Sequence, residues 1–138
     1  MITYKVYSND LEQLEIGDGF FEGWPNPPSK EKHRQILEKS FKSIVAVDEK
    51  NSMIIGFINA VSDGILSAYI PLLEVLPEYR NQGIGTELVK KMLEELKDFY
   101  MVDLCCDESL QEFYKKFGMM KSQGMILRNY KYQCGREI

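Results

Sequence analysis

The chain has 138 residues, a net charge of −4, an isoelectric point near 5.1 and an apolar fraction of 44%, which suits one domain over residues 1–138. The mild acidity argues against general affinity for nucleic acid or an anionic membrane, and the longest apolar run, near residues 65–73, is far shorter than a membrane span. The N-terminus lacks the apolar core of a secretory signal, and an odd count of three cysteines does not fit a disulfide framework, so we expect a cytoplasmic protein.

The first half of the chain is dominated by strand patterns. Alternation of apolar and polar residues predicts strands over residues 2–7, 43–48, 52–61 and 65–75. A short helix is expected at residues 10–14. Residues 17–29 are rich in Gly, Pro and aromatic side chains, which favours a structured loop over a flexible linker.

One helix is predicted between these strands. Ser29 is a typical N-cap residue, and the pattern after it predicts a helix to about Ser40 with Ile36 and Leu37 facing inward. His33, the only histidine of the chain, lies on this helix between charged neighbours. We therefore expect His33 on the solvated face of the helix.

The second half contains the longest amphipathic helix, predicted over residues 83–97. Its apolar stripe consists of Ile84, Leu88, Met92 and Leu96. A short strand at residues 101–105 follows. Ser109 and Glu112 then form a capping-box pattern for a helix that ends at about Phe117, because Gly118 is a natural stop.

The chain closes with two predicted strands, at residues 119–121 and 125–130, on either side of Gln123-Gly124. The expected order is β-α-α-β-β-β-α-β-α-β-β. This order predicts an α/β protein with a mixed sheet and helices on both of its faces.

A glycine loop, Arg80-Asn81-Gln82-Gly83-Ile84-Gly85, joins the strand at residues 65–75 to the long helix. Such a loop directs main-chain N–H groups to the helix N-terminus, where the helix dipole also favours an anion, and the glycines admit a phosphate close to the backbone. The loop lacks the Gly-Lys-Ser/Thr ending of a Walker A motif. It also has Leu88 where a dinucleotide fingerprint needs a third small residue.

The loop instead resembles the acyl-CoA site of the GNAT superfamily of N-acetyltransferases. Arg80, Gly83 and Gly85 match that family's Gln/Arg-x-x-Gly-x-Gly/Ala motif. The preceding segment LEVLPEYR is similar to the family's central strand and turn. Phe113-Tyr114 with Gly118-Met119 is similar to its Phe-Tyr-x-x-x-Gly-Phe element. The resemblance covers nearly the whole chain and implies the GNAT fold, with acetyl-CoA as cosubstrate. No spacing of Cys and His residues in the sequence suggests a metal site.

By this resemblance, acetyl-CoA would be held by backbone and side-chain groups from three places in the chain. The main chain of Leu73, Glu74 and Val75 would bond the pantetheine arm. The pyrophosphate would be held by Asn81, Gln82, Gly83, Ile84, Gly85 and Thr86, with Arg80 beside it. Asp107 stands where the family often has Asn near the pantetheine, so it either contacts CoA or only caps a helix.

Two side chains are candidates for catalysis. Tyr114 matches the family's catalytic tyrosine; its ordinary pKa of about 10 lies near that of a thiol, about 8.5, so it can protonate the departing thiolate. Glu74 interrupts an apolar strand, and burial would raise its pKa towards that of a useful base. The alternatives are a core tyrosine and a carboxylate that is paired or solvated.

Two other groups of residues invite a role. Cys105 and Cys106 are potential nucleophiles, but no histidine is expected near them, so direct transfer in a ternary complex is predicted. The aromatic residues of the 17–29 loop, Phe20, Phe21 and Trp24, lie where the family builds its acceptor lid. Two of the three are at least as well explained as a hydrophobic plug.

The prediction is therefore an N-acetyltransferase that acts on a small-molecule or peptide amine, with a homodimer compatible with the sequence. The rival hypotheses are a non-catalytic acyl-CoA-binding module on the same fold, and an interaction domain whose glycine loop binds nothing.

Overall fold

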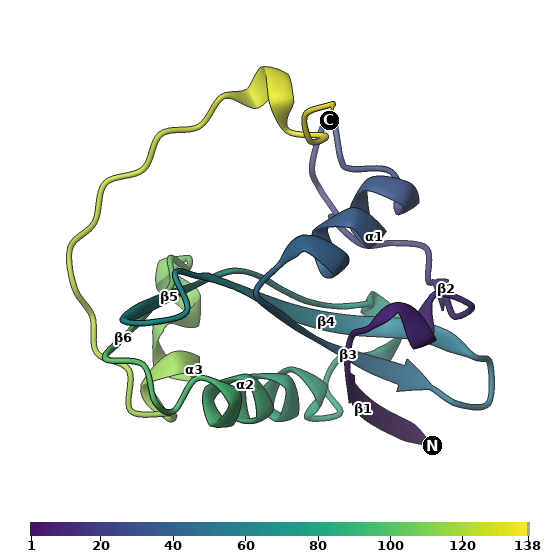
Figure 1. Ribbon diagram of the computed structural model, residues 1–138, viewed down its shortest axis with the longest axis horizontal. Helices are drawn as coiled ribbons and strands as arrows, with labels where there is room; N and C mark the ends of the chain where they lie inside the picture. Colours follow the sequence, from purple (N-terminus) through teal and green to yellow (C-terminus); the bar gives the residue numbers. More distant parts are fainter. Residues whose placement is uncertain (138) are drawn as a thin grey trace.

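A curved mixed sheet of six strands forms the centre of the protein in a computed structural model that describes residues 1–137 (Figure 1). The strands are β1 (Ile2–Val6), β2 (Glu15–Ile16), β3 (Lys42–Asp48), β4 (Met53–Ser62), β5 (Ser67–Val75) and β6 (Met101–Asp103). They are ordered β1-β3-β4-β5-β6, and β2 pairs with β4. The pairs β1–β3, β3–β4 and β4–β5 are antiparallel, whereas β5–β6 and β2–β4 are parallel.

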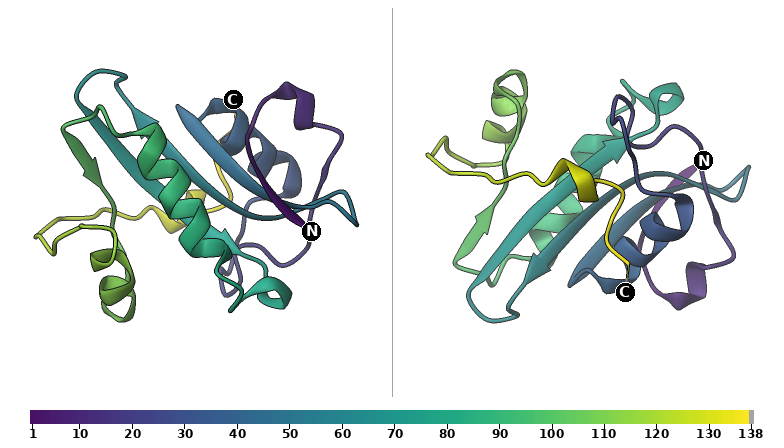
Figure 2. Two further views of the ribbon diagram at one scale, coloured as in Figure 1. Left: turned by 90° about the horizontal axis from the view of Figure 1, so that it is seen from below. Right: turned by 90° about the horizontal axis from the view of Figure 1, so that it is seen from above.

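The helices cover both faces of this sheet. Helix α1 (Lys30–Lys39) lies on one face, and α2 (Ile84–Glu95) lies on the other together with α3 (Gln111–Lys115) (Figures 1 and 2). Single 3₁₀ turns complete the fold: η1 (Asn9–Leu11), η2 (Pro77–Tyr79), η3 (Glu108–Leu110) and η4 (Tyr130–Tyr132). Within residues 1–137, no helix is both long and apolar enough to cross a bilayer.

Alternation along the strands divides the core into two layers. On β3, Ile44 and Ala46 pack towards α2, while Val45 and Val47 pack towards α1. All four side chains are buried, because β3 and its neighbour β4 lie between helices on both sides. The α/β class, the mixed sheet and the GNAT-type layering predicted from the sequence are therefore confirmed.

The boundaries of most predicted elements are also confirmed to within a few residues. The side chain of Ser29 accepts a hydrogen bond from the N–H of Lys32 at 3.1 Å, so it caps α1 as expected. The predicted capping box before α3 is wrong: η3 precedes this helix, and Ser109 lies inside η3.

The end of the sheet opens because β5 contains a bulge. Asn59 pairs with Leu72 and Val61 pairs with Tyr69, so Ile70 and Pro71 together oppose a single residue of β4. Pro71 has no N–H to donate to a ladder. The pairing of β5 with β6 covers only Ser67 to Tyr69, and the two strands diverge beyond it.

The expected position of His33 is wrong. His33 is 2% exposed and packs against the rings of Phe20, Phe21 and Phe57. The helix places His33 one turn from the buried Leu37, so both residues face the sheet. The charged sequence neighbours of His33 suggested that its side chain is exposed to solvent. Its aromatic partners could not be seen in that local pattern, because they come from the distant 17–29 loop and from β4. Within residues 1–137, His33 Nε2 has no hydrogen-bond partner.

The two final strands are also wrong. Residues 119–121 and 125–129 have no strand pairing, and the chain runs in an extended arc to η4, which lies near α1 (Figure 1). The strand-forming sequence is present, but no strand within residues 1–137 pairs with it.

Because the imidazole of His33 is buried, we expect the stability of the folded protein to fall at acidic pH. Burial, aided by the charge of Arg34, lowers the pKa of His33 from 6.5 to about 4. Between these values the unfolded chain binds a proton that the folded chain does not, so the free energy of unfolding falls as the pH drops from 6.5 to 4. We expect this group to contribute a loss of up to about 3 kcal/mol. Urea denaturation at several pH values measures this loss.

The variant His33→Leu is the matched control, because it keeps an apolar side chain and removes the titration. Its free energy of unfolding should fall less over the same window. Since the chain has one histidine, NMR titration of the imidazole gives its pKa directly. A midpoint near 6.5 would contradict the prediction.

Candidate active site

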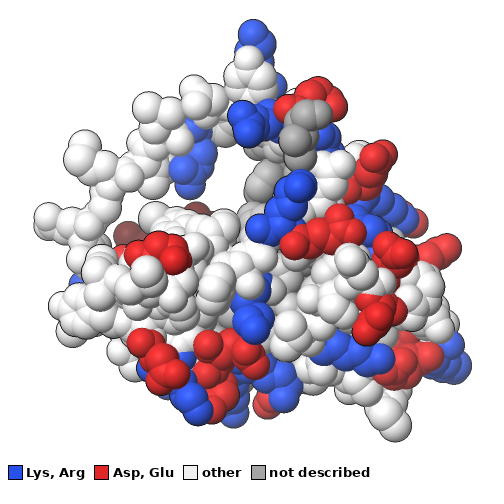
Figure 3. Space-filling view, viewed as in Figure 1, with Lys and Arg blue, Asp and Glu red and all other residues white. Residues whose placement is uncertain are grey.

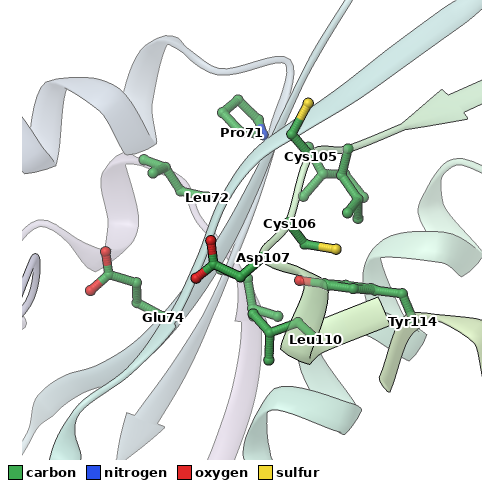
Figure 4. A pocket seen from close by; sticks show the side chains of 11 residues that line it. Pro71, Leu72, Glu74, Cys105, Cys106, Asp107, Leu110 and Tyr114 are labelled. Carbon is green, nitrogen blue, oxygen red and sulfur yellow. The ribbon is translucent and has the colours of Figure 1, made fainter. Parts of the chain in front are cut away.

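A cavity of about 230 Å³ lies where β5 and β6 diverge. Its walls come from the β5 segment that follows the bulge, from the chain after β6 and from α3 (Figure 4). Glu74, Cys106, Asp107 and Tyr114 contribute side chains to this cavity. Three of the residues singled out from sequence, namely Glu74, Asp107 and Tyr114, are thus brought together by the splayed strands.

Tyr114 is held on α3 with its ring buried and its hydroxyl directed at the cavity (Figure 4). The ring packs against Phe113 with centroids 4.9 Å apart, and only 9% of the residue is exposed. Among the described residues, no acceptor takes a hydrogen bond from this hydroxyl. The proton of Tyr114 is therefore available to a ligand in the cavity.

Burial, with a smaller effect from Cys106, raises the pKa of Tyr114 to about 12. This group keeps its proton at neutral pH. The value moves away from that of a thiol, about 8.5, so the expected match between donor and leaving group is weaker than the sequence suggested. A neutral hydroxyl in a partly dry cavity is still a strong hydrogen-bond donor to a developing thiolate.

Glu74 occupies the other end of the cavity and turns towards the 17–29 loop rather than towards Tyr114 (Figure 4). Its Oε1 accepts a hydrogen bond from the N–H of Phe21 at 2.7 Å. Burial raises the pKa of Glu74 above 4.5, while the Phe21 bond and the charge of Arg80 lower it and Glu22 raises it. The net result is a carboxyl group that is more basic than a surface glutamate.

The bond from Phe21 to Glu74 depends on a strained backbone. Phe21 has φ +62°, in the left-handed region that bulky residues rarely adopt, at a cost of about 1–2 kcal/mol. Its ring is nevertheless buried against Phe57 and His33, and its N–H faces Glu74. The 17–29 loop is thereby fixed over one end of the cavity.

The glycine loop precedes the first turn of α2, whose N-cap residue Gly83 has φ +79°. Within residues 1–137, no N–H from Asn81 to Thr86 donates to a protein acceptor. A Cβ built on Gly85 would meet no atom within 4 Å, so the loop is open on that side. The unpaired amides and the open space beside Gly85 are compatible with the phosphate site predicted from the sequence.

Arg80 is engaged differently from the sequence expectation. Its Nε donates to the carbonyl of Val75 at 3.1 Å, and its guanidinium lies 3.3 Å from Glu22 Oε1. The guanidinium thus bridges the end of β5 to the 17–29 loop. Both side chains are about half exposed, so the ion pair is weak and compatible with exchange for a phosphate.

Asp107 stands at the N-cap of η3, yet its side chain makes no capping hydrogen bond. Its carboxylate lines the cavity instead (Figure 4). Of the two alternatives for Asp107, side-chain capping is therefore not observed, and the carboxylate is accessible from the cavity.

The cysteines after β6 were undervalued at the sequence level. Cys105 and Cys106 both line the cavity, and all three cysteines are free thiols. The signal was available, because they follow a strand that runs parallel to β5, and carboxyl ends of parallel strands meet at one sheet edge. His33 lies in the layer on the α1 side and offers them no base. Among residues 1–137, no cluster of His, Cys, Asp and Glu has metal-binding geometry.

The aromatic residues of the loop behave mainly as a plug. Phe20 and Phe21 pack on Phe57, and Trp24 packs on Phe21 at 4.9 Å between ring centroids. The interpretation of two of these residues as a hydrophobic plug is confirmed. The acidic residues of the loop are also paired, since Asp18 lies 2.6 Å from Lys30 and Glu22 contacts Arg80.

Comparison with known proteins agrees with this geometry. The family model of the GNAT acetyltransferases matches residues 9–119. The chain belongs to the GNAT acetyltransferase family. Members of this family use acetyl-CoA as the acetyl donor, and the open glycine loop and splayed strands described above fit such a ligand.

Similar structures and sequences are found in several organisms. A crystal structure of a Deinococcus radiodurans R1 protein, classed as an acetyltransferase, has a TM-score of 0.89 and 42% identity, covering 99% of this chain and 94% of that one. A GNAT family acetyltransferase from Streptococcus pneumoniae TIGR4 has a TM-score of 0.69 and 32% identity, covering 94% and 98%.

Among curated sequences, the uncharacterised N-acetyltransferase ycf52 of Gracilaria tenuistipitata var. liui is 29% identical over 125 residues, or 86% of this chain. The chain spans 66% of the length of that relative and 59% of its counterpart in Pyropia yezoensis.

Proposed function

We propose that this GNAT protein transfers an acetyl group from acetyl-CoA to an amine by direct attack in a ternary complex. The observation that carries the proposal is one cavity with a proton donor, Tyr114, at one end and a basic carboxylate, Glu74, at the other. The unpaired amides of the glycine loop support an adjacent site for the acyl donor.

For the donor, we propose the contacts implied by the family motif. The main chain of Leu73 to Val75 would bond the pantetheine arm at the place where β5 has lost β6 as a partner. The pyrophosphate would take the amides from Asn81 to Thr86, and Arg80 would leave Glu22 to join it. Asp107 would lie beside the pantetheine.

For the reaction, the acetyl donor supplies a thioester carbonyl, and the neutral amine nitrogen forms the new bond to its carbon while the bond to sulfur breaks. Glu74, directly or through water, would accept the proton that the amine loses. Tyr114 would donate its proton to the departing sulfur. Protons therefore balance, with one taken up at Glu74 and one given by Tyr114. Neither cysteine is needed as a nucleophile.

The acceptor, a small molecule or a peptide, would bind at the Glu74 end of the cavity, beside the 17–29 loop. Because Arg80 would leave Glu22 when acetyl-CoA binds, both Glu22 and Glu74 would be available to a cationic amine, whereas Asp18 is paired with Lys30. We further propose a cytoplasmic protein with one domain. A non-catalytic acyl-CoA-binding module is the second candidate. The observation that favours it is the raised pKa of Tyr114, which lies well above the pKa of a thiol.

The direct test is consumption of the acetyl-CoA thioester in the presence of a panel of amines, polyamines, amino acids, aminoglycosides and peptides. Loss of thioester absorbance is the readout, because thiol-reactive dyes would label the free cysteines. We expect acceptor-dependent consumption. Tight binding of acetyl-CoA by calorimetry with no consumption across the panel would favour the binding module.

Tyr114→Phe tests the proton donor. We expect kcat to fall by roughly 100-fold, because general acid catalysis contributes at least this much, with acetyl-CoA affinity changed by less than about threefold. Tyr100→Phe is the control, since Tyr100 is an exposed tyrosine outside the cavity. An unchanged kcat in Tyr114→Phe would remove Tyr114 from this role.

Glu74→Gln tests the base, and the amide oxygen still accepts the Phe21 N–H bond. The raised pKa of Glu74 means that the wild type loses its base as the pH falls through that value. We expect the variant to lose most activity above the pKa of Glu74, where the wild type has its base, and to lose less below that pKa, where the wild type has lost its base too. Glu12→Gln is the matched control, because Glu12 is exposed and lies outside the cavity. A loss that is equal at every pH indicates a structural role instead.

Gly85→Asp tests the phosphate site. The position has room for a Cβ, and an acidic residue in the first turn of a helix is stabilising, so we expect the melting temperature to be kept or raised. The same carboxylate repels a pyrophosphate, so we expect acetyl-CoA affinity to fall at least about tenfold, which isothermal titration measures. Gly85→Asn, with the same shape and no charge, should lose less. Unchanged affinity in Gly85→Asp would place the pyrophosphate elsewhere.

A further inference from the structure

The cavity beside β6 contains a thiol that the proposed reaction does not use. Cys106 is a half-buried, free cysteine, and it lines the cavity together with Tyr114. Figure 4 shows its sulfur turned towards the hydroxyl of Tyr114, and Cys106 is close enough to that hydroxyl to help raise its pKa. The sulfur of the neighbouring Cys105 points away from Tyr114 in the same view. Cys106 is therefore the cysteine that a ligand in the cavity would meet.

The hydroxyl of Tyr114 indicates where such a ligand would lie. The residue is 9% exposed, and no acceptor among the described residues takes a hydrogen bond from this hydroxyl. A buried donor without a partner costs free energy unless a ligand or a water molecule satisfies it. A group that accepts this hydrogen bond from within the cavity lies next to the sulfur of Cys106 as well.

The proposed function, on which the following inference rests, puts the sulfur of CoA at that point. The departing sulfur takes its proton from Tyr114, which requires the two atoms to come within hydrogen-bond reach. The pantetheine arm would approach along the part of β5 that no longer pairs with β6, at Leu73 to Val75. Two sulfurs, one from CoA and one from Cys106, would then lie beside a single hydroxyl.

The protein is open to solvent beside these strands. Residues 120–128 run in an extended arc past β5 and β6 and make no backbone–backbone hydrogen bond in the described part of the chain (Figure 1). The space-filling view in Figure 3 shows an opening between this arc and the body of the protein. A ligand can therefore reach the region of β5 and β6 from solvent.

We propose that Cys106 is a redox modification site that takes up CoA as a mixed disulfide. The co-reactant is a disulfide of CoA, seated with one pantetheine arm along β5. Cys106 attacks the sulfur of that arm as its thiolate, a sulfur–sulfur bond forms between Cys106 and CoA, and the original sulfur–sulfur bond breaks. The proton lost by Cys106 ends on the departing thiol. The sulfur of Cys106 is oxidised and the departing sulfur is reduced, so no other oxidant is needed.

The attached CoA would occupy the site of the acetyl donor. The modified protein is then closed to acetyl-CoA until a thiol reductant releases the attached CoA. Seating of the disulfide also makes the modification selective, because binding turns the exchange at Cys106 into a reaction within one complex. Cys105 and Cys134 meet the same disulfide only by collision from solvent. Acetyl transfer would therefore stop when oxidised CoA accumulates and resume on reduction.

The test treats the full chain with CoA disulfide and follows it by intact-protein mass spectrometry and peptide mapping. We expect one CoA per chain, attached at Cys106 and removed by dithiothreitol. Glutathione disulfide is the comparison probe, because it has the same reactive bond but no pantetheine or pyrophosphate. CoA disulfide should modify Cys106 at least about tenfold faster than glutathione disulfide does at the same concentration. Equal rates with the two disulfides overturn the proposal.

Three variants locate the modification. Cys106→Ser should lose it, and Cys134→Ser is the matched control, because Cys134 is a free cysteine of similar exposure outside the cavity. Gly85→Asp should slow the reaction with CoA disulfide and leave the reaction with glutathione disulfide unchanged. Attachment of CoA at Cys105 or Cys134 in place of Cys106 overturns the proposal.

Calorimetry with reduced CoA separates this inference from the proposed function. Binding of CoA without modification of Cys106 by CoA disulfide overturns the disulfide inference alone. Absence of CoA binding overturns the acyl-donor site, and the inference with it. The mass of the modified chain does not depend on the amine acceptor, so an unidentified acceptor does not affect this result.

Discussion

The bulge at Ile70 and Pro71 is the constraint on which the site depends. It bends β5 away from β6, and Pro71 has no N–H for a ladder, so two strands that start as a parallel pair separate after three residues. The buried Asn59 supports this geometry, because its carbonyl accepts the N–H of Leu72 at 3.2 Å and its amide donates to Ser40 at 3.0 Å. One polar side chain thus satisfies a backbone group next to the bulge and ties the sheet to the end of α1.

The same opening sets the electrostatics of the cavity. Burial disfavours the charged form of any acid, so it raises the pKa of both Tyr114 and Glu74. For Tyr114 the result is a hydroxyl that retains its proton, and for Glu74 it is a carboxylate that accepts one more readily. A single physical effect therefore gives the two ends of the cavity complementary roles, while the strained Phe21 backbone keeps Glu74 oriented towards the loop.

Two segments outside the sheet, the 17–29 loop and residues 119–128, are held in place to different extents. The 17–29 loop is held by aromatic packing and by the ion pairs of Lys30 and Arg80. Residues 120–128, in contrast, make no backbone–backbone hydrogen bond in the described part of the chain, and the chain after them is tied back by the bond from Asn26 to Gln133.

The sequence by itself determined the elements and the chemistry of the loop. Apolar periodicity located β3, β4, β5 and α2, and Ser29 located the start of α1, because these are short-range patterns. The Arg80 to Gly85 motif likewise predicted a phosphate site at a loop whose amides have no partner within residues 1–137. The family resemblance selected Tyr114, and the interruption of an apolar strand selected Glu74; both line the cavity.

Only the tertiary structure decided the rest, because the rest depends on contacts between distant segments. His33 was assigned to solvent, since its aromatic partners are up to 24 positions away in the chain. The pKa of Tyr114 and the pairing of Arg80 with Glu22 depend on burial and contacts that no local pattern contains. The final strands were predicted correctly as strand-forming sequence but wrongly as strands of this sheet, because pairing requires a neighbour and local propensity does not specify one.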